Sequence, residues 1–372
     1  MRFPEFTEEW KAEQLDNIAT LSKGIGISKE QLSEDGEPCI LYGELYTKYK
    51  SEIIKQVESK TDINGSKLKR SKANDVIIPC SGETAVDIAT ARCVPFDNIL
   101  FGGGLNVISL HQYDGAFMSY QLNGKRKYDI ARVAQGVSIV HLYGEHLKAI
   151  KTYNPTLPEQ QKIAKLLSLL DDRIDTQNKI IEDLKLLKSA ISLNVLHSDT
   201  WEQFKIKDIA QIGRGRVISS IEISQQKNPT YPVYSSQTSN DGIMGYLDDY
   251  MFEGEYISWT TDGANAGTVF YRNGKFNCTN VCGLLKLIKG FDTHFVSLVL
   301  AEATKKYVSI NLANPKLMNN TMGNIQICLP KLEEQKRISI VFRVLQRLWT
   351  VHNSLLTEYI KQKQYLLSQM FI

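Results

Sequence analysis

A long amphipathic segment that occurs twice constrains the fold of this 372-residue chain more than any other feature. In the first copy, from Leu157 to His197, apolar residues alternate in steps of four and three, which is the heptad spacing of a coiled coil. Such a stripe predicts one long helix with one buried face. Its seam positions are Ile163, Leu167, Leu170, Ile174, Ile181 and Leu184, and the polar residues Gln177 and Lys188 interrupt it.

The second copy keeps the register of the first. Ile338 lies 175 residues after Ile163, and each later seam position repeats at the same distance, including the polar interruptions. The acid that suits a helix N-terminus also recurs, since Glu159 is matched by Glu334. We therefore predict a second helix of similar length. Its seam positions are Ile338, Phe342, Leu345, Trp349, Leu356 and Tyr359, with His352 and Lys363 at the interruptions.

Two ways of burying these seams are open. Each helix could pack onto its own globular module, or the two matched seams could pack against each other, which their equal length and register favour. The 28 residues from Ile163 to Ile191 would make a seam of about 42 Å in a helix approaching ~60 Å. One turn of B-DNA is about 34 Å long.

The segments that precede the two helices also correspond. Trp10, Ile18, Ala19, Gly24 and Ser28 match Trp201, Ile209, Ala210, Gly215 and Ser219, each 191 residues later and without a gap. Because the distance falls to 175 at the helices, the length difference lies in the modules and the helices have a fixed length. We expect a first module over residues 1–155, a helix over 156–199, a second module over 200–330 and a helix over 331–372.

Each module mixes strand patterns with short helices, which predicts an α+β fold with two similar α/β modules. Residues 8–21 are typical of a helix that opens the first module. Runs rich in Val, Ile and Leu predict strands at Asp75–Ser81 and Cys282–Ile288. Residues 255–276 predict two strands joined by a turn that contains Asp262-Gly263.

Composition, with 42% apolar and 23% charged residues, is that of a soluble globular protein, and the length suggests two or three domains. The net charge of +3 permits an anionic partner. No apolar run reaches the length of a membrane span and no signal peptide is present, so we expect a cytoplasmic protein without a membrane partner. The six cysteines lack paired spacing, which predicts reduced and mostly buried thiols: Cys39, Cys80, Cys93, Cys278, Cys282 and Cys328.

The motifs of catalysis are missing. The chain has no G-x-x-x-x-G-K-[ST] phosphate loop, no G-x-S-x-G elbow, no H-E-x-x-H pair and no acidic pair with a lysine of nuclease type. Its Asn-Pro pairs are followed by Thr or Lys, whereas an amino-methyltransferase would need a second proline and an aromatic residue. We therefore predict no catalytic residue, metal or cofactor in this chain.

Several polar segments instead suit DNA. Arg214 and Arg216 alternate with glycines, and an arginine can take guanine O6 and N7 together. A basic cluster suits phosphate contact, although a solvated surface loop would have the same composition. Residues 234–238 and 260–265 are dense in hydroxyl and amide groups that could read base edges, although turns use the same residue types. The candidates are Lys67, Lys69, Arg70 and Lys72 in the cluster, and Tyr234, Ser236, Gln237, Thr238, Thr261 and Asn265 in the polar segments.

The arrangement resembles the DNA specificity subunit of type I restriction-modification systems. Both long helices open on Leu-x-Glu-Gln-x-Lys/Arg-Ile, and the phrases LYGELYTKY, SGETAVDIA, FGGGLN and TTDGANAGTVFY resemble target recognition domains of that family. The resemblance covers essentially the whole chain. The bulkier Trp349 and His352 in the second seam leave the exact helix pairing open. From the first module we add Lys23, Tyr42, Ser81 and Thr84 to the candidate DNA contacts.

The resemblance implies a subunit that does no chemistry itself. Two target recognition domains would each read one half of an asymmetric bipartite DNA target, and two antiparallel helices, related by a pseudo-twofold, would act as the ruler between them. The implied partners are double-stranded DNA, two adenine-methyltransferase subunits that use S-adenosylmethionine, and two motor/nuclease subunits that use ATP and Mg²⁺.

Two other classes of function stay open at this point. A stand-alone nucleic-acid enzyme with degenerate motifs would methylate DNA without a partner subunit. A coiled-coil adaptor with protein- or carbohydrate-binding modules would fail to bind duplex DNA even with a methyltransferase present.

Overall fold

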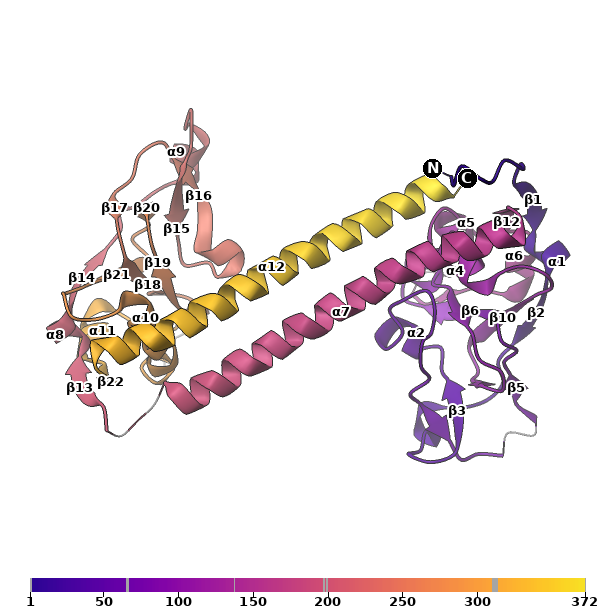
Figure 1. Cartoon of the computed structure of the whole chain (residues 1–372), viewed down its shortest axis with the longest axis horizontal. Coiled ribbons are helices and arrows are strands. Elements are labelled where there is room, and N and C mark those ends of the chain that lie inside the picture. Colours follow the sequence, from indigo (N-terminus) through magenta and orange to yellow (C-terminus); the bar gives the residue numbers. More distant parts are fainter. Residues whose placement is uncertain are drawn as a thin grey trace. The chain divides into compact units, whose positions relative to one another are not determined.

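The computed structural model describes residues 2–64, 67–136, 138–196, 198, 200–309 and 314–371. Internal contacts divide the chain into two units, which are unit 1 (residues 1–180 with 352–372) and unit 2 (residues 181–351). Two long helices, α7 (Leu157–Val195) and α12 (Leu332–Met370), each contribute residues to both units. Figure 1 labels the elements along the chain.

Both expected long helices are present, and each has 39 residues. The first ends at Val195, before the expected His197, which lies outside the described residues together with Ile372. The equal lengths confirm that the repeated stripe encodes two copies of one helix.

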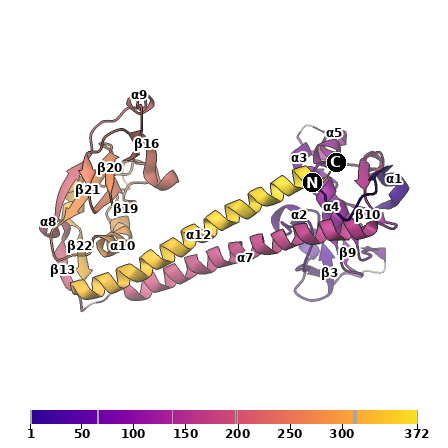
Figure 2. The ribbon, with the colours of Figure 1, turned by 45° about the horizontal axis from the view of Figure 1, so that its top comes forward.

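Unit 1 is built on an antiparallel sheet of order β2-β10-β6-β8. Helix α4 packs on β6 and β8, and the unit also contains the sheets β4-β3-β9-β5, β1-β12 and β7-β11. Figure 2 gives a second view of α4 and β10. The elements are β1 (Lys11–Gln14), α1 (Leu15–Ile18), β2 (Ala19–Lys23), η1 (Lys29–Gln31), β3 (Glu37–Ile40), α2 (Glu44–Thr47), β4 (Lys60–Thr61), β5 (Lys69–Arg70), β6 (Asp75–Pro79), β7 (Ser81–Gly82), α3 (Ala85–Ile88), β8 (Arg92–Val94), β9 (Leu100–Phe101), β10 (Leu105–Leu110), α4 (Gly115–Asn123), α5 (Lys127–Val133), β11 (Val140–His141), α6 (Gly144–Lys148) and β12 (Lys151–Asn154).

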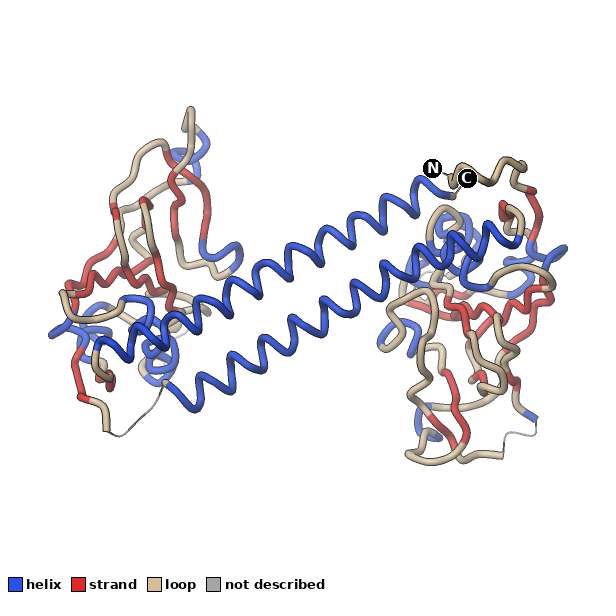
Figure 3. Tube along the Cα trace, viewed as in Figure 1, coloured by secondary structure: helices blue, strands red, loops and turns tan. Residues whose placement is uncertain are grey.

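Unit 2 repeats this topology with fewer residues. Its main antiparallel sheet has the order β14-β21-β18-β19, and β13-β22 and β16-β15-β20-β17 repeat two of the smaller sheets, including the parallel central pair. Figure 3 colours the strands of both units red and their helices blue. The elements are β13 (Glu202–Lys205), α8 (Ile206–Ile209), β14 (Ala210–Arg214), α9 (Ser220–Ser224), β15 (Tyr231–Tyr234), η3 (Ser239–Gly242), β16 (Ile243–Leu247), β17 (Phe252–Glu253), β18 (Tyr256–Thr260), β19 (Val269–Arg272), β20 (Lys275–Cys278), β21 (Cys282–Leu287), α10 (Thr293–Ala303), η4 (Thr304–Lys306), α11 (Asn319–Asn324) and β22 (Gln326–Leu329).

These elements confirm the predicted α+β class and most of the predicted strands. β6, β21 and the pair β18 and β19 lie where the β-branched and apolar runs indicated. The helix expected over residues 8–21 is wrong, because only Leu15–Ile18 is helical and strands β1 and β2 flank it. Pairing of β1 with β12 and of β2 with β10 overrides the local helical pattern.

A buried glutamine fixes the start of each long helix on its module. In unit 1 the Gln160 amide donates to Pro155 O at 2.8 Å and accepts from Asp114 N at 2.9 Å. In unit 2, Gln335 makes the same two bonds to Pro330 O and Asp292 N, at 2.8 and 2.9 Å. Each aspartate also caps α4 or α10. The duplication therefore extends to single hydrogen bonds.

In unit 1 the seams of both helices are buried in one cluster. Ile163, Leu167 and Leu170 from the first turns of α7 pack with Leu366 and Met370 from the last turns of α12, and Phe117 and Tyr120 of α4 join them. Both predicted ways of burial therefore operate together, because each seam touches its own module and the other helix.

In unit 2 the relation is reversed. Ile338 and Phe342 from the first turns of α12 pack on Phe295 of α10, and Ile191 and Val195 from the last turns of α7 pack against the same core. The start of each helix thus meets the end of the other, so α7 and α12 are antiparallel. The remaining seam residues are buried or half-buried, namely Ile174, Ile181, Leu184, Leu345, Trp349, Leu356 and Tyr359.

The matched polar interruptions Gln177 and His352 contact each other. His352 Nδ1 lies 2.7 Å from Gln177 Oε1. A residue and its own counterpart can meet in this way only when two antiparallel stripes share one register. This contact settles the pairing that the bulkier second seam left open.

The same glycine is required in both modules. A Cβ at Gly24 would lie 2.0 Å from Gly102 O, and one at Gly215 would lie 1.6 Å from Cys278 O. The chain crosses strand β9 or β20 at this point, where only a glycine backbone fits. These close approaches explain why the turn after β2 and β14 keeps its glycine.

Candidate nucleic-acid interface

One end of the main sheet in unit 1 gathers three of the predicted residues. Lys23 is the last residue of β2, and Ser81 lies two residues beyond the end of β6. Tyr42 follows β3, is 43% exposed and packs on Gly104, where a Cβ would come within 2.8 Å of Tyr42 Cδ1. A cation, a hydroxyl and an accessible aromatic ring therefore share one surface.

Three further residues of this surface were missed from the sequence. Lys23 Nζ lies 5.6 Å from the ring centroid of Tyr143, and Ser81 Oγ lies 3.2 Å from His141 Nδ1. The Tyr46 hydroxyl donates to Ser81 O at 3.0 Å, and burial raises the pKa of Tyr46, so it stays protonated. The residues of each contacting pair are at least 35 positions apart along the chain, so no local spacing pattern could have paired them.

A cavity of about 630 Å³ opens on this surface. Tyr42, Tyr46, Ser81, Asp87 and Ile139 line part of it. Thr84 lies nearby but caps helix α3, where its hydroxyl accepts from Asp87 N at 3.1 Å. Its exposed side chain therefore already has a structural role.

The predicted basic cluster lies on a different sheet of unit 1. Lys69 and Arg70 form strand β5, which pairs with β9. Arg70 binds Glu37 through two hydrogen bonds of 2.6 and 2.9 Å, and this contact lowers the pKa of Glu37. The charge of Arg70 is thus compensated, and the exposed Lys67 and Lys72 are the members most open to a phosphate.

The two predicted arginines of unit 2 differ in their partners. Arg214 is the last residue of β14, and its Nε donates to Asn319 Oδ1 at 2.8 Å. Arg216 instead forms a two-pronged ion pair with Glu222, which lowers the pKa of that carboxyl. Because Arg214 is held by a neutral amide, its positive charge is the less compensated of the two.

A buried arginine, Arg272, contacts both ends of the polar loop that follows β15. The Arg272 guanidinium lies 3.6 Å from the Tyr234 ring centroid and donates to Asp241 Oδ2 at 3.0 Å. Asn240 and Asp241 have left-handed φ angles of 49° and 52°. Between these anchors, Gln237 donates to Ile243 O, Ser236 is half-buried and Thr238 is exposed.

The second polar segment is less accessible than its composition suggested. Thr261 is fully buried and donates to Asp262 Oδ2 at 2.6 Å, so its side chain cannot contact a ligand in this conformation. Asp262 lies 3.7 Å from Lys316 Nζ. Asn265 is exposed. Neither Asp262 nor Lys316 was among the predicted DNA contacts, although Asp262 lies in the predicted polar segment and turn.

Lys23 and Arg214 occupy the same place in the two modules. They are 191 residues apart, and each ends the edge strand of the main sheet. Their strand partners, Asn106 and Gly283, both lie near the start of the next strand. One cationic side chain therefore marks the same sheet end in both copies, with different neighbours around it.

Three further properties concern the residues that the structure describes. Within these residues no group of three or more His, Cys, Asp or Glu side chains could hold a metal, and no helix is long and apolar enough to cross a membrane. The six cysteines are free, and burial raises the pKa of Cys39 to about 11 and that of Cys93 to about 12. The thiols of Cys39 and Cys93 are therefore buried and protonated, which suits a structural role.

Comparison with known proteins gives a family match over most of the chain. The family model described as the type I restriction modification DNA specificity domain matches residues 7–186 and 198–361. A putative type I specificity subunit of Mycoplasma pneumoniae is 39% identical over 198 residues, which are 52% of this chain and 82% of that protein. The MpnII specificity subunit of the same organism is 43% identical over 150 residues, which are 40% of this chain and 44% of that protein.

Solved structures share the fold. The crystal structure of a type I restriction-modification S subunit from M. genitalium matches with a TM-score of 0.74 and 17% identity, covering 100% of this chain and 97% of that one. A second structure, from a study of type I complex assembly and conformational transition, matches with a TM-score of 0.53 and 14% identity. It covers 98% of this chain and 97% of the other.

Proposed function

The chain belongs to the type I restriction modification DNA specificity family, and on that premise we propose that each unit reads one half of a bipartite DNA target at the sheet end marked by Lys23 or Arg214. The chain is the DNA specificity subunit of a type I system and a non-catalytic component of it. The two alternatives, an enzyme and an adaptor without DNA, are thereby set aside.

The equivalent position of Lys23 and Arg214 is the observation that supports this proposal. A cation at the same sheet end in both copies suits the same task, because both lysine and arginine can contact guanine O6 and N7 or a phosphate. The neighbours differ, with Tyr42, Ser81 and Tyr143 in unit 1. Two reading surfaces of different chemistry would recognise two different half-sites, so the target would be asymmetric.

The Tyr234–Thr238 loop, Asn265 and the exposed lysines Lys67 and Lys72 would contribute further contacts. Loop residues held by Arg272 can present hydroxyl and amide groups without losing much conformational entropy on binding. Thr261 would act indirectly, by orienting Asp262.

The partners proposed for this subunit follow from the family. In a type I complex it would bind two adenine-methyltransferase subunits with S-adenosylmethionine, and two motor/nuclease subunits with ATP and Mg²⁺ for restriction. The methyltransferase would flip the target adenine out of the duplex. That the helix pair sets the length of the unspecified spacer stays a prediction.

The experiment is methylation-motif mapping with the reconstituted complex of this chain and its methyltransferase subunit. Arg214→Ala should relax base preference in one half-site by about tenfold or more, since a bidentate contact supplies ~1–3 kcal/mol of discrimination. Lys23→Ala should relax the other half-site. Both substitutions should leave the remaining half of the motif intact.

Lys289→Ala is the matched control, because this exposed lysine lies just beyond the opposite end of β21. It should leave the motif unchanged. Equal relaxation of both halves by Arg214→Ala would contradict the assignment of one half-site to each unit.

A further inference from the structure

In unit 1 the N-terminal segment covers the start of α7. The Arg2 guanidinium binds the fully buried Glu159 carboxylate through two hydrogen bonds of 2.7 Å. Trp10 Nε1 donates to the same carboxylate at 3.4 Å. Lys162 on the next turn pairs with Glu5 and lies 4.6 Å from the Phe3 ring centroid.

In unit 2 the corresponding residues are present, but the carboxylate is exposed instead of buried. Glu334 stands where Glu159 stands, Trp201 where Trp10 stands, and Arg337 where Lys162 stands. Trp201 packs on Phe295 at 5.9 Å, just as Trp10 packs on Phe117 at 5.8 Å. Glu334 is nevertheless exposed, and no ion pair or side-chain hydrogen bond from the described residues reaches its carboxylate.

Lys331 also lines the site in unit 2, three residues before Glu334, but none of the ion pairs among the described residues joins the two side chains. By the 191-residue spacing, the residues that correspond to Arg2–Glu9 are Leu193–Thr200, with the sequence LNVLHSDT, which contains neither arginine nor lysine. The arginine that neutralises the buried carboxylate in unit 1 therefore has no arginine or lysine counterpart in the equivalent segment of unit 2.

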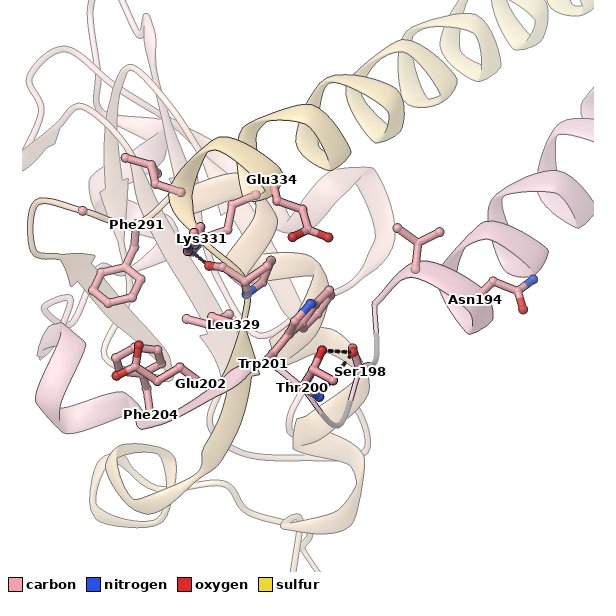
Figure 4. A pocket seen from close by; sticks show the side chains of 15 residues that line it. Asn194, Ser198, Thr200, Trp201, Glu202, Phe204, Phe291, Leu329, Lys331 and Glu334 are labelled. Carbon is pink, nitrogen blue, oxygen red and sulfur yellow. Dashed lines mark hydrogen bonds between the residues drawn. The ribbon is translucent and has the colours of Figure 1, made fainter.

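A cavity of about 810 Å³ lies there instead (Figure 4). Glu334 and Trp201 line it, together with Phe204, Phe291 and Leu329. The two phenylalanine rings pack edge to face with centroids 5.2 Å apart. Its volume falls within the usual range of ligand sites, ~300–1,000 Å³.

One wall of the cavity also differs in polarity from its counterpart. In unit 1 the equivalent positions hold Glu13 and Tyr113, whose side chains bond to each other at 2.8 Å. In unit 2 they hold Phe204 and Phe291. Among the described residues, the cavity therefore combines the Glu334 carboxylate, which makes no ion pair, with an apolar wall. Such a combination suits an arginine next to an aromatic or aliphatic side chain.

We propose that the Trp201–Glu334 cavity is a docking site for an extended segment of another protein, one that carries an arginine for Glu334 and a neighbouring apolar side chain for Phe204 and Phe291. The Arg2–Glu9 segment in unit 1 shows the chemistry of the occupant. An acidic residue next along the segment would meet Arg337, as Glu5 meets Lys162.

The occupant comes from another protein rather than from a second copy of this chain. The one segment of this chain known to fit such a site is already bound within unit 1, where Arg2 is paired with Glu159. A partner's segment has no such competing contact. In unit 1 the chain's own N-terminal segment occupies the equivalent site, whereas in unit 2 the site is open. Each chain would therefore bind one such segment.

The test uses the full chain and an acetylated peptide of sequence RFPEFTEE with a C-terminal fluorescein, followed by fluorescence anisotropy. We expect saturable binding that weakens with salt, and about tenfold weaker binding to Glu334→Gln, since a two-pronged charged pair is lost. A peptide with citrulline in place of arginine should bind the original chain equally weakly.

Glu333→Gln is the matched control, because Glu333 is in the same helical turn, is exposed and does not line the cavity. It should bind the peptide like the original chain. Chain labelled with 5-fluorotryptophan locates the peptide, with resonances assigned by Trp201→Phe and Trp10→Phe. The Trp201 resonance should shift on binding and the Trp10 resonance should not.

Four outcomes would overturn the proposal. Three of these are no peptide binding at millimolar concentration, binding that Glu334→Gln leaves unchanged, and a shift of Trp10 in place of Trp201. A fourth is a dimer of the chain in sedimentation velocity that Glu334→Gln abolishes, since it would make a second copy the occupant. None of these readouts involves DNA, so they are independent of half-site recognition.

Discussion

The two units hold the same pair of helices with different chemistry. In unit 1, Lys363 of α12 lies 2.6 Å from Asp171 and 2.5 Å from Glu52, and all three side chains are at most 15% exposed. The Tyr120 hydroxyl donates to Asp171 at 2.6 Å. In unit 2 the counterpart Lys188 is exposed and lies 3.4 Å from the amide of Gln346.

Gln346 stands where Asp171 stands, so Lys188 faces a neutral amide where Lys363 faces a carboxylate. Burial raises the pKa of Asp171, and Lys363 opposes that rise. A buried carboxylate of this kind is tolerated only while its cation is in place. The two units therefore share the backbone and the apolar seam. They differ because unit 1 has a buried ionic network where unit 2 has a solvated polar contact.

The largest expected effect comes from breaking the buried network. Lys363→Met should lower the free energy of unfolding of unit 1 by ~3–5 kcal/mol, because Asp171 and Glu52 lose their cation. Lys188→Met should change unit 2 by about 0.5 kcal/mol or less, because Lys188 is solvated. Urea unfolding measures both, and hydrogen exchange assigns each transition to a unit. Similar losses for the two variants would show that the networks do not differ in energy.

A loss of stability of intermediate size, equal in the two units, is expected at the matched glutamines that begin α7 and α12. Gln160→Ala and Gln335→Ala should each lower stability by ~1–3 kcal/mol, since each leaves a buried backbone N–H and C=O without a partner. Gln161→Ala, an exposed neighbour, is the control and should be nearly neutral. Losses that differ by more than about 1 kcal/mol would mean that the matched bonds have unmatched surroundings.

The smallest effect is a pH dependence confined to unit 2. His294, whose Nδ1 lies 2.8 Å from Ser339 Oγ, has its pKa lowered to about 4 by burial and then by Arg343. The unfolded state, with a pKa near 6.5, therefore takes up a proton that the folded state does not. Unit 2 should lose stability as the pH falls from about 6.5 to 4, with no further loss from this group below that.

Unit 1 carries Ala116 at the corresponding position, so His294→Ala makes unit 2 resemble unit 1 in this respect. Urea unfolding at pH 7 and pH 4.5, with hydrogen exchange to separate the units, provides the measurement. The variant should have a smaller difference between the two pH values than the original chain. An unchanged difference would assign the pH dependence to other groups.

Local pattern was enough to predict the helices and several strands. The heptad stripe from Ile163 and its repeat from Ile338 depend on residues within a few turns of each other, and their burial follows directly. The strand at Asp75–Pro79 was similarly evident, because consecutive β-branched residues are buried on both faces of a sheet. The helix predicted over residues 8–21 was wrong because the conformation of this segment depends on strand pairing with β12 and β10, which lie far along the chain.

The candidate site was predictable only by residue type. Lys23, Tyr42 and Ser81 lie on one surface as proposed partners, but Thr261 is buried and Arg216 is paired with Glu222. Accessibility and charge compensation depend on which side chains the fold brings into contact. Composition carries no such information, so Tyr143 and Lys316 could not have been chosen from the sequence.

The sequence by itself determined that two equal helices follow two related modules, because periodicity and spacing are properties of the chain alone. Only the tertiary structure decided that Gln177 meets His352, that Lys363 is buried among carboxylates while Lys188 is solvated, and that Glu334 has no arginine where Glu159 has Arg2. Each of these contacts joins residues more than 150 positions apart, and such contacts depend on packing rather than on local sequence.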